Sequence, residues 1–211
     1  MRVNVYVDGF NLYYGIRYYD RNAQNYRWLD LLKLSQRLLP SHQIGRVRYF
    51  RAQVDGRGDP GSPLRQQIYW RALQTLPNLT IHKGQFLSNS IRMPLANPPQ
   101  NGPRTVEVWK TEEKGSDVNI ATYLLLDCFR QDYDMAVVIS NDSDLIEPIM
   151  AVRKEFGCSV GVFNPQQGFS NALKRAATFY TKIQEQHLAS SQFPPSIQVG
   201  NSTITRPREW T

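Results

Sequence analysis

The sequence has little of what builds thiolate metal sites, disulfides or membrane spans. It contains two cysteines, Cys128 and Cys158, and three histidines in 211 residues, without the spacing of a zinc site. We therefore expect neither disulfides nor structural zinc. No apolar run is long enough to cross a bilayer, and polar residues interrupt the N-terminal run, which is too short for a signal sequence. These features predict a soluble, cytoplasmic protein with no membrane partner.

Positive charge, in contrast, is in excess. The formal net charge is +7, which favours a polyanionic partner, although many basic proteins merely carry solvated lysines and arginines. Seven arginines face only two aspartates between residues 37 and 71. We expect arginines of this stretch, among them Arg46, Arg48 and Arg51, to contact a nucleic-acid backbone.

Strand-like and helix-like segments alternate along the chain. Strands are predicted at 2–7, 45–54, 135–139 and 159–163, with helices ending near 19 and at 28–39, 63–76, 116–129, 141–156 and 168–177. Between them we expect short strands in 79–91 and at 106–109, and a loop rich in proline and glycine at 93–104 that acts as a mobile flap. This alternation predicts a mostly parallel sheet with helices on both faces. We expect one domain over residues 1–180, then a helix end and extended tail over 181–211.

Four aspartates fall where such a sheet collects ligands. Asp8 follows the first strand directly, and Asp142 and Asp144 follow the apolar strand 135–139. Asp117 opens a helix, on the stripe that faces the sheet. Because the carboxyl ends of parallel strands meet at one edge, these side chains can converge in one cleft.

Clustered carboxylates repel one another and raise each other's pKa unless a cation lies between them. An all-oxygen ligand set favours Mg²⁺ or Mn²⁺, which polarises a phosphodiester and activates water. The alternative is structural: Asp117 and Asp142 are each explained as helix N-caps, and Asp8 as part of a turn. Capping, however, does not predict that all of them lie at one edge.

Three segments together resemble the motifs of NYN domains, a PIN-like family, and specifically its bacterial LabA-like branch. They are Val7 to Asn11, Glu113 to Val118 and Ser140 to Leu145. The resemblance covers roughly residues 1 to 180. It implies a PIN-like three-layer α/β/α sandwich and a Mg²⁺- or Mn²⁺-dependent ribonuclease that takes part in RNA processing or decay.

On this resemblance, Asp8, Asp117, Asp142 and Asp144 are the catalytic, metal-binding acids. Asn11, Lys114 and Ser140 join the arginines as substrate contacts. The expected activity is endonucleolytic hydrolysis of RNA, most readily single-stranded. A non-catalytic RNA-binding or regulatory module with a vestigial acidic site is the alternative, and a homodimer is left open.

Overall fold

The computed structural model describes residues 1–19 and 25–210. Its centre is a six-stranded sheet, ordered β3-β2-β1-β6-β7-β8, in which every neighbouring pair of strands is parallel. The strand order reverses between β1 and β6. The strands are β1 Arg2–Asp8, β2 Gln43–Phe50, β3 Leu79–His82, β6 Met135–Ile139, β7 Ser159–Asn164 and β8 Phe179–Lys182.

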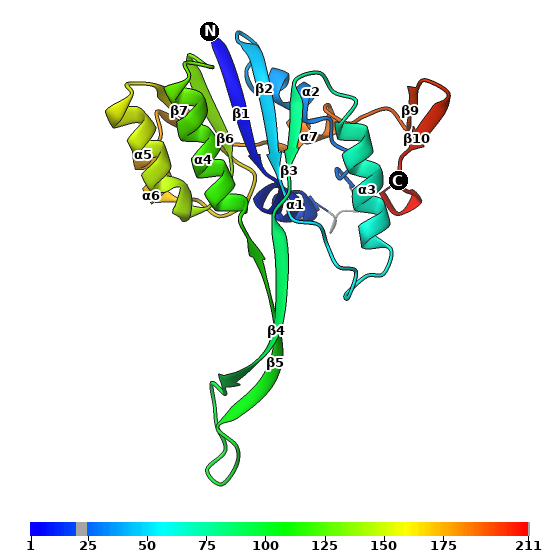
Figure 1. Cartoon of the computed structure of the whole chain (residues 1–211), viewed down its shortest axis with the longest axis vertical. Helices are drawn as coiled ribbons and strands as arrows, with labels where there is room; N and C mark the ends of the chain where they lie inside the picture. Colours follow the sequence, from blue (N-terminus) through cyan, green and yellow to red (C-terminus); the bar gives the residue numbers. More distant parts are fainter. Residues whose placement is uncertain (20–24, 211) are drawn as a thin grey trace.

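Helices cover both faces of this sheet (Figure 1). Val3, Val5 and Val7 of β1 point into one hydrophobic core, and Tyr6 points into the other, as strand alternation requires. The predicted α/β/α sandwich is thus confirmed. The first core is covered by α1 Gly9–Arg17, α2 Leu31–Leu38, α3 Ser62–Leu73 and α7 Glu185–Ala189, and the second by α4 Ser116–Phe129, α5 Ile146–Glu155 and α6 Asn171–Ala176. Within the described residues, no helix combines the length and apolar character that a membrane span needs.

Two predicted segments have the expected bounds, and others shift by a few residues. The helix at 116–129 and the strand at 135–139 are confirmed. The strand expected at 45–54 ends at Phe50, because the backbone of Ala52 bonds to side chains of Glu113 and Gln66 instead of a neighbouring strand. The helix expected from residue 141 begins as a 3₁₀ turn, Ser143–Leu145, which Asp142 caps.

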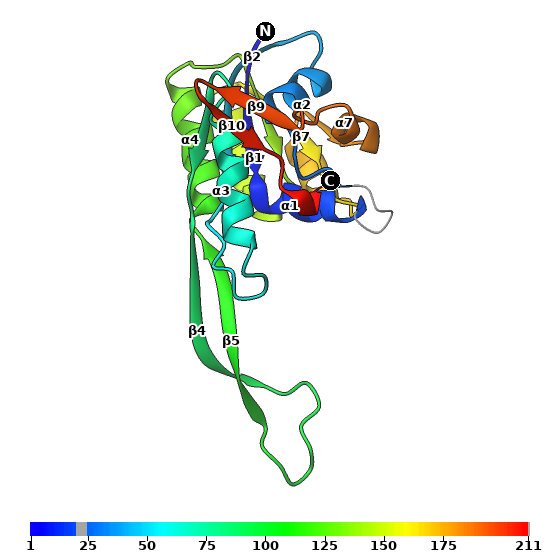
Figure 2. The ribbon, with the colours of Figure 1, turned by 90° about the vertical axis from the view of Figure 1, so that its right-hand side faces the viewer.

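The largest difference from the sequence prediction is a long hairpin. Strands β4 Gln85–Pro94 and β5 Thr105–Lys114 pair antiparallel over their whole length and form a separate two-stranded sheet. This arm projects far from the sandwich (Figures 1 and 2). The proline-rich loop predicted at 93–104 is the connection at its tip. The short strands predicted around it were wrong in length, because a ribbon with solvent on both faces lacks the burial alternation that reveals strands.

Residues 181–210 fold back onto the sandwich, so the extended tail predicted there was wrong. After α7 they form a hairpin, β9 Ser196–Val199 and β10 Ser202–Thr205, and a 3₁₀ turn at Arg208–Trp210. Phe193 and Trp210 pack beside the buried ring of Trp28. Residue 211 lies outside the described residues, and a domain boundary at residue 180 stays a prediction.

A buried ion pair joins α4 to the sheet. The Arg48 guanidinium donates to both carboxylate oxygens of Asp127, at 2.7 and 2.8 Å. The Tyr6 hydroxyl donates to the same carboxylate at 2.7 Å. Since Asp127 is 1% exposed, removing its charge would leave the Arg48 cation buried without a counterion.

We therefore predict that Asp127→Asn lowers the free energy of unfolding by about 3 kcal/mol. The matched change Asp55→Asn, in the exposed pair between Arg57 and Asp55, should cost less than about 1 kcal/mol. Urea denaturation followed by circular dichroism measures both. Equal losses in the two variants would contradict a special role for the buried pair.

Candidate metal centre

Asp8 lies at the carboxyl end of β1 and begins α1. Its Oδ1 accepts hydrogen bonds from the backbone amides of Phe10 and Asn11, both at 3.0 Å. Its Oδ2 accepts from Asn11 Nδ2 and Ser140 Oγ, both at 2.8 Å. The side chain therefore caps α1, where the structural alternative expected only a turn, and it is also fixed in one orientation. Asp8 is 2% exposed, so its carboxylate sits at the inner end of the site.

Asp117 and Asp142 approach Asp8 from two other segments. Asp117 is in the first turn of α4, after Gly115, whose φ of +95° turns the chain from β5 into the helix. Asp142 follows β6, and its amide donates to Ser140 Oγ at 3.0 Å. One carboxylate oxygen from each of the three aspartates lies within 4.8 Å of the others. These acids meet where the strand order reverses, the usual ligand position in such a sheet.

Two of the three carboxylates, Asp8 and Asp117, have a raised pKa. Burial, followed by the negative charges of Asp8, Asp142, Glu113 and Asp144, raises the pKa of Asp117 to about 6. Burial also raises the pKa of Asp8, against the effect of its hydrogen bonds to Asn11 and Ser140. A divalent cation among these oxygens would relieve the repulsion. Oxygen ligands in this number fit Mg²⁺ or Mn²⁺, which complete their coordination with water and substrate oxygens.

Asn11 connects the acidic cluster to two loops. Besides donating to Asp8, its Oδ1 accepts from the Asn141 amide at 3.2 Å and from Gln166 Nε2. It therefore ties α1 to the loops after β6 and β7. Gln166 had no signal in the sequence, because only the tertiary fold brings it to this edge.

Glu113 is a second residue that sequence reasoning did not select. Its Oε1 accepts from the Ala52 amide at 2.9 Å and from Ser116 Oγ at 2.5 Å. This carboxylate thus holds the segment after β2 against the base of the arm. Its position in the same motif as Asp117 was the available signal.

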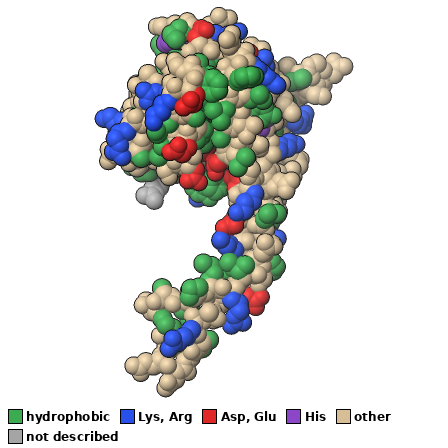
Figure 3. Space-filling model, turned by 60° about the vertical axis from the view of Figure 1, so that its left-hand side comes forward, with side chains coloured by type: hydrophobic (Ala, Val, Ile, Leu, Met, Phe, Trp, Pro, Cys, Tyr) green, Lys and Arg blue, Asp and Glu red, His purple; other side chains and the backbone are tan. Residues whose placement is uncertain are grey.

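Two predicted site residues lie at the margin. Asp144 is exposed and is not one of the three clustered acids, although its charge contributes to the raised pKa of Asp117. The Lys114 ammonium lies 3.0 Å from Glu112, on the exposed surface of β5. Figure 3 shows acidic side chains gathered on the rim of the sandwich from which the arm extends.

The structure gives the three predicted arginines other partners. Arg46 pairs with Asp132, which precedes β6 and so lies toward the opposite edge of the sheet. Arg48 is buried in its pair with Asp127. Arg51 is buried as well, and its guanidinium donates to the Gly9 carbonyl at 2.8 Å and stacks on the rings of Phe10 and Tyr13. Arg46 is therefore exposed but lies away from the acidic cluster, Arg48 is not exposed, and Arg51 supports the turn after Asp8.

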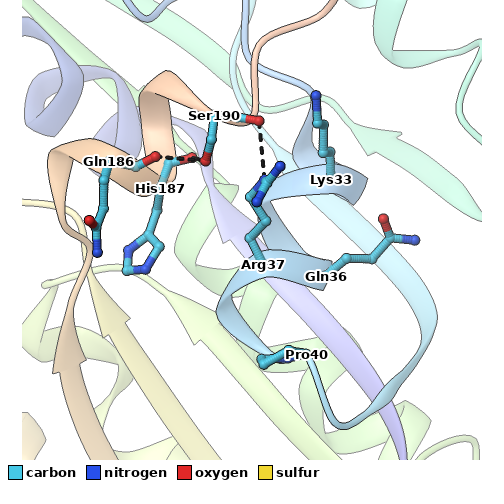
Figure 4. A pocket seen from close by; sticks show the side chains of 7 residues that line it. All are labelled: Lys33, Gln36, Arg37, Pro40, Gln186, His187 and Ser190. Atoms are coloured by element: carbon cyan, nitrogen blue, oxygen red, sulfur yellow. Dashed lines mark hydrogen bonds between the residues drawn. The ribbon is translucent and has the colours of Figure 1, made fainter.

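The cavities on the surface of the described residues include two on the side of the sheet that α1, α2, α3 and α7 cover. A cleft of about 740 Å³ between α2 and α7 contains Lys33, Arg37 and His187 and has no carboxylate in its lining (Figure 4). A second cavity, of about 110 Å³, lies between α1 and α3. Its lining includes Gly9, so only the turn after Asp8 separates it from the acidic cluster.

The parallel sandwich with acids at the reversal of strand order defines a PIN-like α/β protein. The sequence model of the NYN domain family matches residues 2–184, and the chain belongs to that family. This confirms the resemblance to NYN domains drawn from the three motifs.

The proteins similar to the chain include one enzyme and one protein of known structure. It is 26% identical, over 100% of its length and 75% of the other's, to 6-hydroxy-3-succinoylpyridine 3-monooxygenase HspA of Pseudomonas putida (strain DSM 28022 / S16). A crystal structure of a protein of unknown function from Vibrio parahaemolyticus superimposes with a TM-score of 0.57 at 15% identity, covering 87% of this chain and 93% of that one. The second likeness concerns the fold alone.

The raised pKa of Asp117 predicts a pH-dependent stability in metal-free protein. Because the folded pKa of about 6 lies above the reference value of 3.8, folding favours the protonated acid. The resulting stability is complete below the reference pKa and is lost as the pH rises through about 6. Asp117→Asn should remove this dependence of the free energy of unfolding on pH. Between pH 4 and pH 7 the free energy of unfolding of the variant, relative to that of the wild type, should therefore rise by on the order of 1 kcal/mol, after allowance for solvent screening. Urea denaturation in EDTA measures the difference, and a constant difference across this range would contradict the crowding of charge.

Proposed function

We propose that this protein is a metal-dependent endoribonuclease that hydrolyses single-stranded RNA. The observation that carries the proposal is the convergence of Asp8, Asp117 and Asp142 at the reversal of strand order. Membership of the NYN family supports it, since NYN domains have a nuclease-like fold and generally bind RNA. The net charge of +7 suits a phosphate-rich substrate.

The three aspartates would hold Mg²⁺ or Mn²⁺. A bound ion of this kind polarises the phosphodiester and lowers the pKa of water, so that hydroxide is available near neutral pH. The chain's own contribution is preorganisation. Four hydrogen bonds fix the Asp8 carboxylate before any substrate arrives, and Ser140 couples it to the Asp142 amide. We assign Asn11 and Ser140 to orienting this ligand, and Asp144 to attracting the cation from the rim.

The first test is cleavage of labelled single-stranded RNA with Mn²⁺, Mg²⁺ or EDTA. Asp142→Asn should reduce the rate of cleavage by more than about 100-fold. Mutation of a residue that only supports a metal ligand already lowers metal affinity or activity by about 10- to 100-fold, and Asp142 is proposed as a ligand itself. Asp144→Asn is the matched control, two residues away and outside the cluster, and should lose less. Circular RNA should be cut as well, because an endonuclease needs no free end.

Binding and catalysis are separated by a thermal-shift titration with Mn²⁺. The wild type should gain stability with rising Mn²⁺, Asp142→Asn should not, and near-ultraviolet circular dichroism should be the same for both. Tight RNA binding without cleavage at any metal concentration would instead identify a non-catalytic RNA-binding module.

The Pseudomonas relative suggests a second candidate, oxygenation of a pyridine compound. The small cavity between α1 and α3 favours it. Tyr13, Tyr49 and Trp210 line this cavity together with Arg51 and Arg65. Arg51 donates to the Gly9 carbonyl and Arg65 pairs with Asp59, so a bound carboxylate would compete with Asp59 for Arg65. The aromatic part of the lining suits a planar ring such as a pyridine.

This candidate is tested with 6-hydroxy-3-succinoylpyridine, dissolved oxygen and a reduced nicotinamide as two-electron donor. A monooxygenase would insert one oxygen atom into the substrate and reduce the other to water, with one nicotinamide oxidised per product. Nuclease function predicts no substrate-dependent nicotinamide oxidation. Turnover that is equal in wild type and Asp142→Asn would place the activity in the small cavity and away from the acidic cluster.

A further inference from the structure

Trp109 has an unusual position for a tryptophan. It lies in the middle of β5, on the arm, and is 71% exposed. The other three tryptophans, Trp28, Trp70 and Trp210, are buried in the sandwich. An indole ring of this size normally packs or binds something, so its exposure points to a ligand.

The face of the arm that carries Trp109 is polar around the ring, with Phe86 at the base of the arm and Pro94 toward its tip. Ser90 lies opposite Trp109 in the register and donates to Glu107. Ser88 and Thr111 are hydrogen-bonded at 2.6 Å on the same face. A single ring among hydroxyl and charged groups differs from the contiguous apolar patch expected of a protein interface.

Cationic groups accompany the ring. The Arg57 guanidinium, from the loop after β2, lies 5.3 Å from the centre of the Trp109 ring and also pairs with Asp55. Arg92 is on the same face, opposite Glu107 in the register, and donates to Thr105 Oγ1 at 3.3 Å. Among the described residues, neither Arg92 nor Arg104 near the tip has an ion-pair partner. Their charges are therefore available for phosphates.

This face runs directly to the acidic cluster. Glu113 is four residues along β5 from Trp109, so alternation places both side chains on one face, about 14 Å apart at the spacing of an antiparallel strand. Glu113 in turn bonds to Ser116 Oγ, next to Asp117. A strand of nucleic acid that follows the arm therefore leads into the proposed metal centre.

We propose that the Trp109 face of the arm is a binding track for single-stranded RNA, in which a base stacks on the Trp109 ring and phosphates contact Arg57 and Arg92. The inference rests on the proposed nuclease function. It specifies how the part of the RNA that extends past the cleaved phosphodiester is held. Stacking on an aromatic ring is independent of base identity, since every base has a π-face. The track therefore gives affinity for unpaired RNA of any sequence.

The opposite face of the arm suggests a different partner. By the register, Leu87, Ile91, Met93, Val106 and Val108 lie there. Lys110 and Lys114 lie on the same face toward the base, where both pair with Glu112. The exposed apolar side chains of Leu87, Met93 and Val106 suit contact with a second copy of the chain. Trp109 and its arginines point the other way, and this is why we assign their face to RNA.

The test uses the intrinsic fluorescence of the full chain in the Asp142→Asn background, which prevents cleavage during titration. Single-stranded RNA of about 12 nucleotides should quench the emission of the one exposed tryptophan. Trp109→Phe should remove the quenching and keep most of the affinity measured by anisotropy. Trp109→Ala should bind roughly tenfold more weakly, and Met93→Ala, on the opposite face, should bind like its parent.

Cleavage kinetics provide an independent readout in the otherwise unaltered chain. Trp109→Ala should lower kcat/KM for the long RNA by about tenfold and leave a dinucleotide substrate unaffected, since one nucleoside on either side of the cut phosphate is too short to reach the ring. Unchanged binding and cleavage in Trp109→Ala would overturn the track, whereas absence of cleavage in the wild type would overturn the nuclease function. Loss of self-association in Trp109→Ala with unchanged RNA affinity would identify the face as a protein interface instead.

Discussion

The arrangement of this molecule depends on carboxylates held together where the strand order reverses. Asp8 ends β1, Asp142 follows β6, and these strands are neighbours in the sheet. Their loops and helices diverge to opposite sides, which leaves the edge open. Asp117 enters from α4, so that three negative groups share a space that burial makes unfavourable for charge. The fold tolerates this repulsion because Asn11 and Ser140 hydrogen-bond the innermost carboxylate, and a cation would convert the repulsion into binding energy.

Local rules were sufficient to predict the centre of this site. An acid directly after a buried strand must lie at its carboxyl end, and an acid in the first turn of a helix against the sheet must lie at the same edge. These two rules placed Asp8, Asp117 and Asp142 correctly relative to one another. They failed to separate Asp142 from Asp144, because that distinction depends on the 3₁₀ turn, in which Asp142 accepts from the Asp144 amide while the Asp144 side chain stays in solvent.

The arginines and the arm could not be predicted in this way. Whether an arginine in a strand meets solvent or a buried acid depends on the element packed over it, and Asp127 is 79 residues away from Arg48 in sequence. The length of the two strands of the arm could not be predicted for a related reason. Strand prediction relies on one face being buried, whereas both faces of β4 and β5 are largely exposed. Gln166 likewise reaches Asn11 only through the loop after β7.

The buried pair between Arg48 and Asp127 has a consequence for the acidic cluster. Asp127 and Asp117 are ten residues apart on α4, about 15 Å along the helix axis. Tyr6 and Arg48 bind one end of this helix to β1 and β2, while the other end carries Asp117 to Asp8. Tyr6 and Asp8 belong to the same face of β1.

A buried charge pair is weak evidence for stability alone, since apolar packing often stabilises as well. Its directional bonds, however, fix how far α4 can slide along the sheet, and an apolar contact would not. The position of Asp117 relative to Asp8 is therefore constrained from both ends of the helix, by Glu113 through Ser116 at the near end and by Tyr6 and Arg48 through Asp127 at the far end.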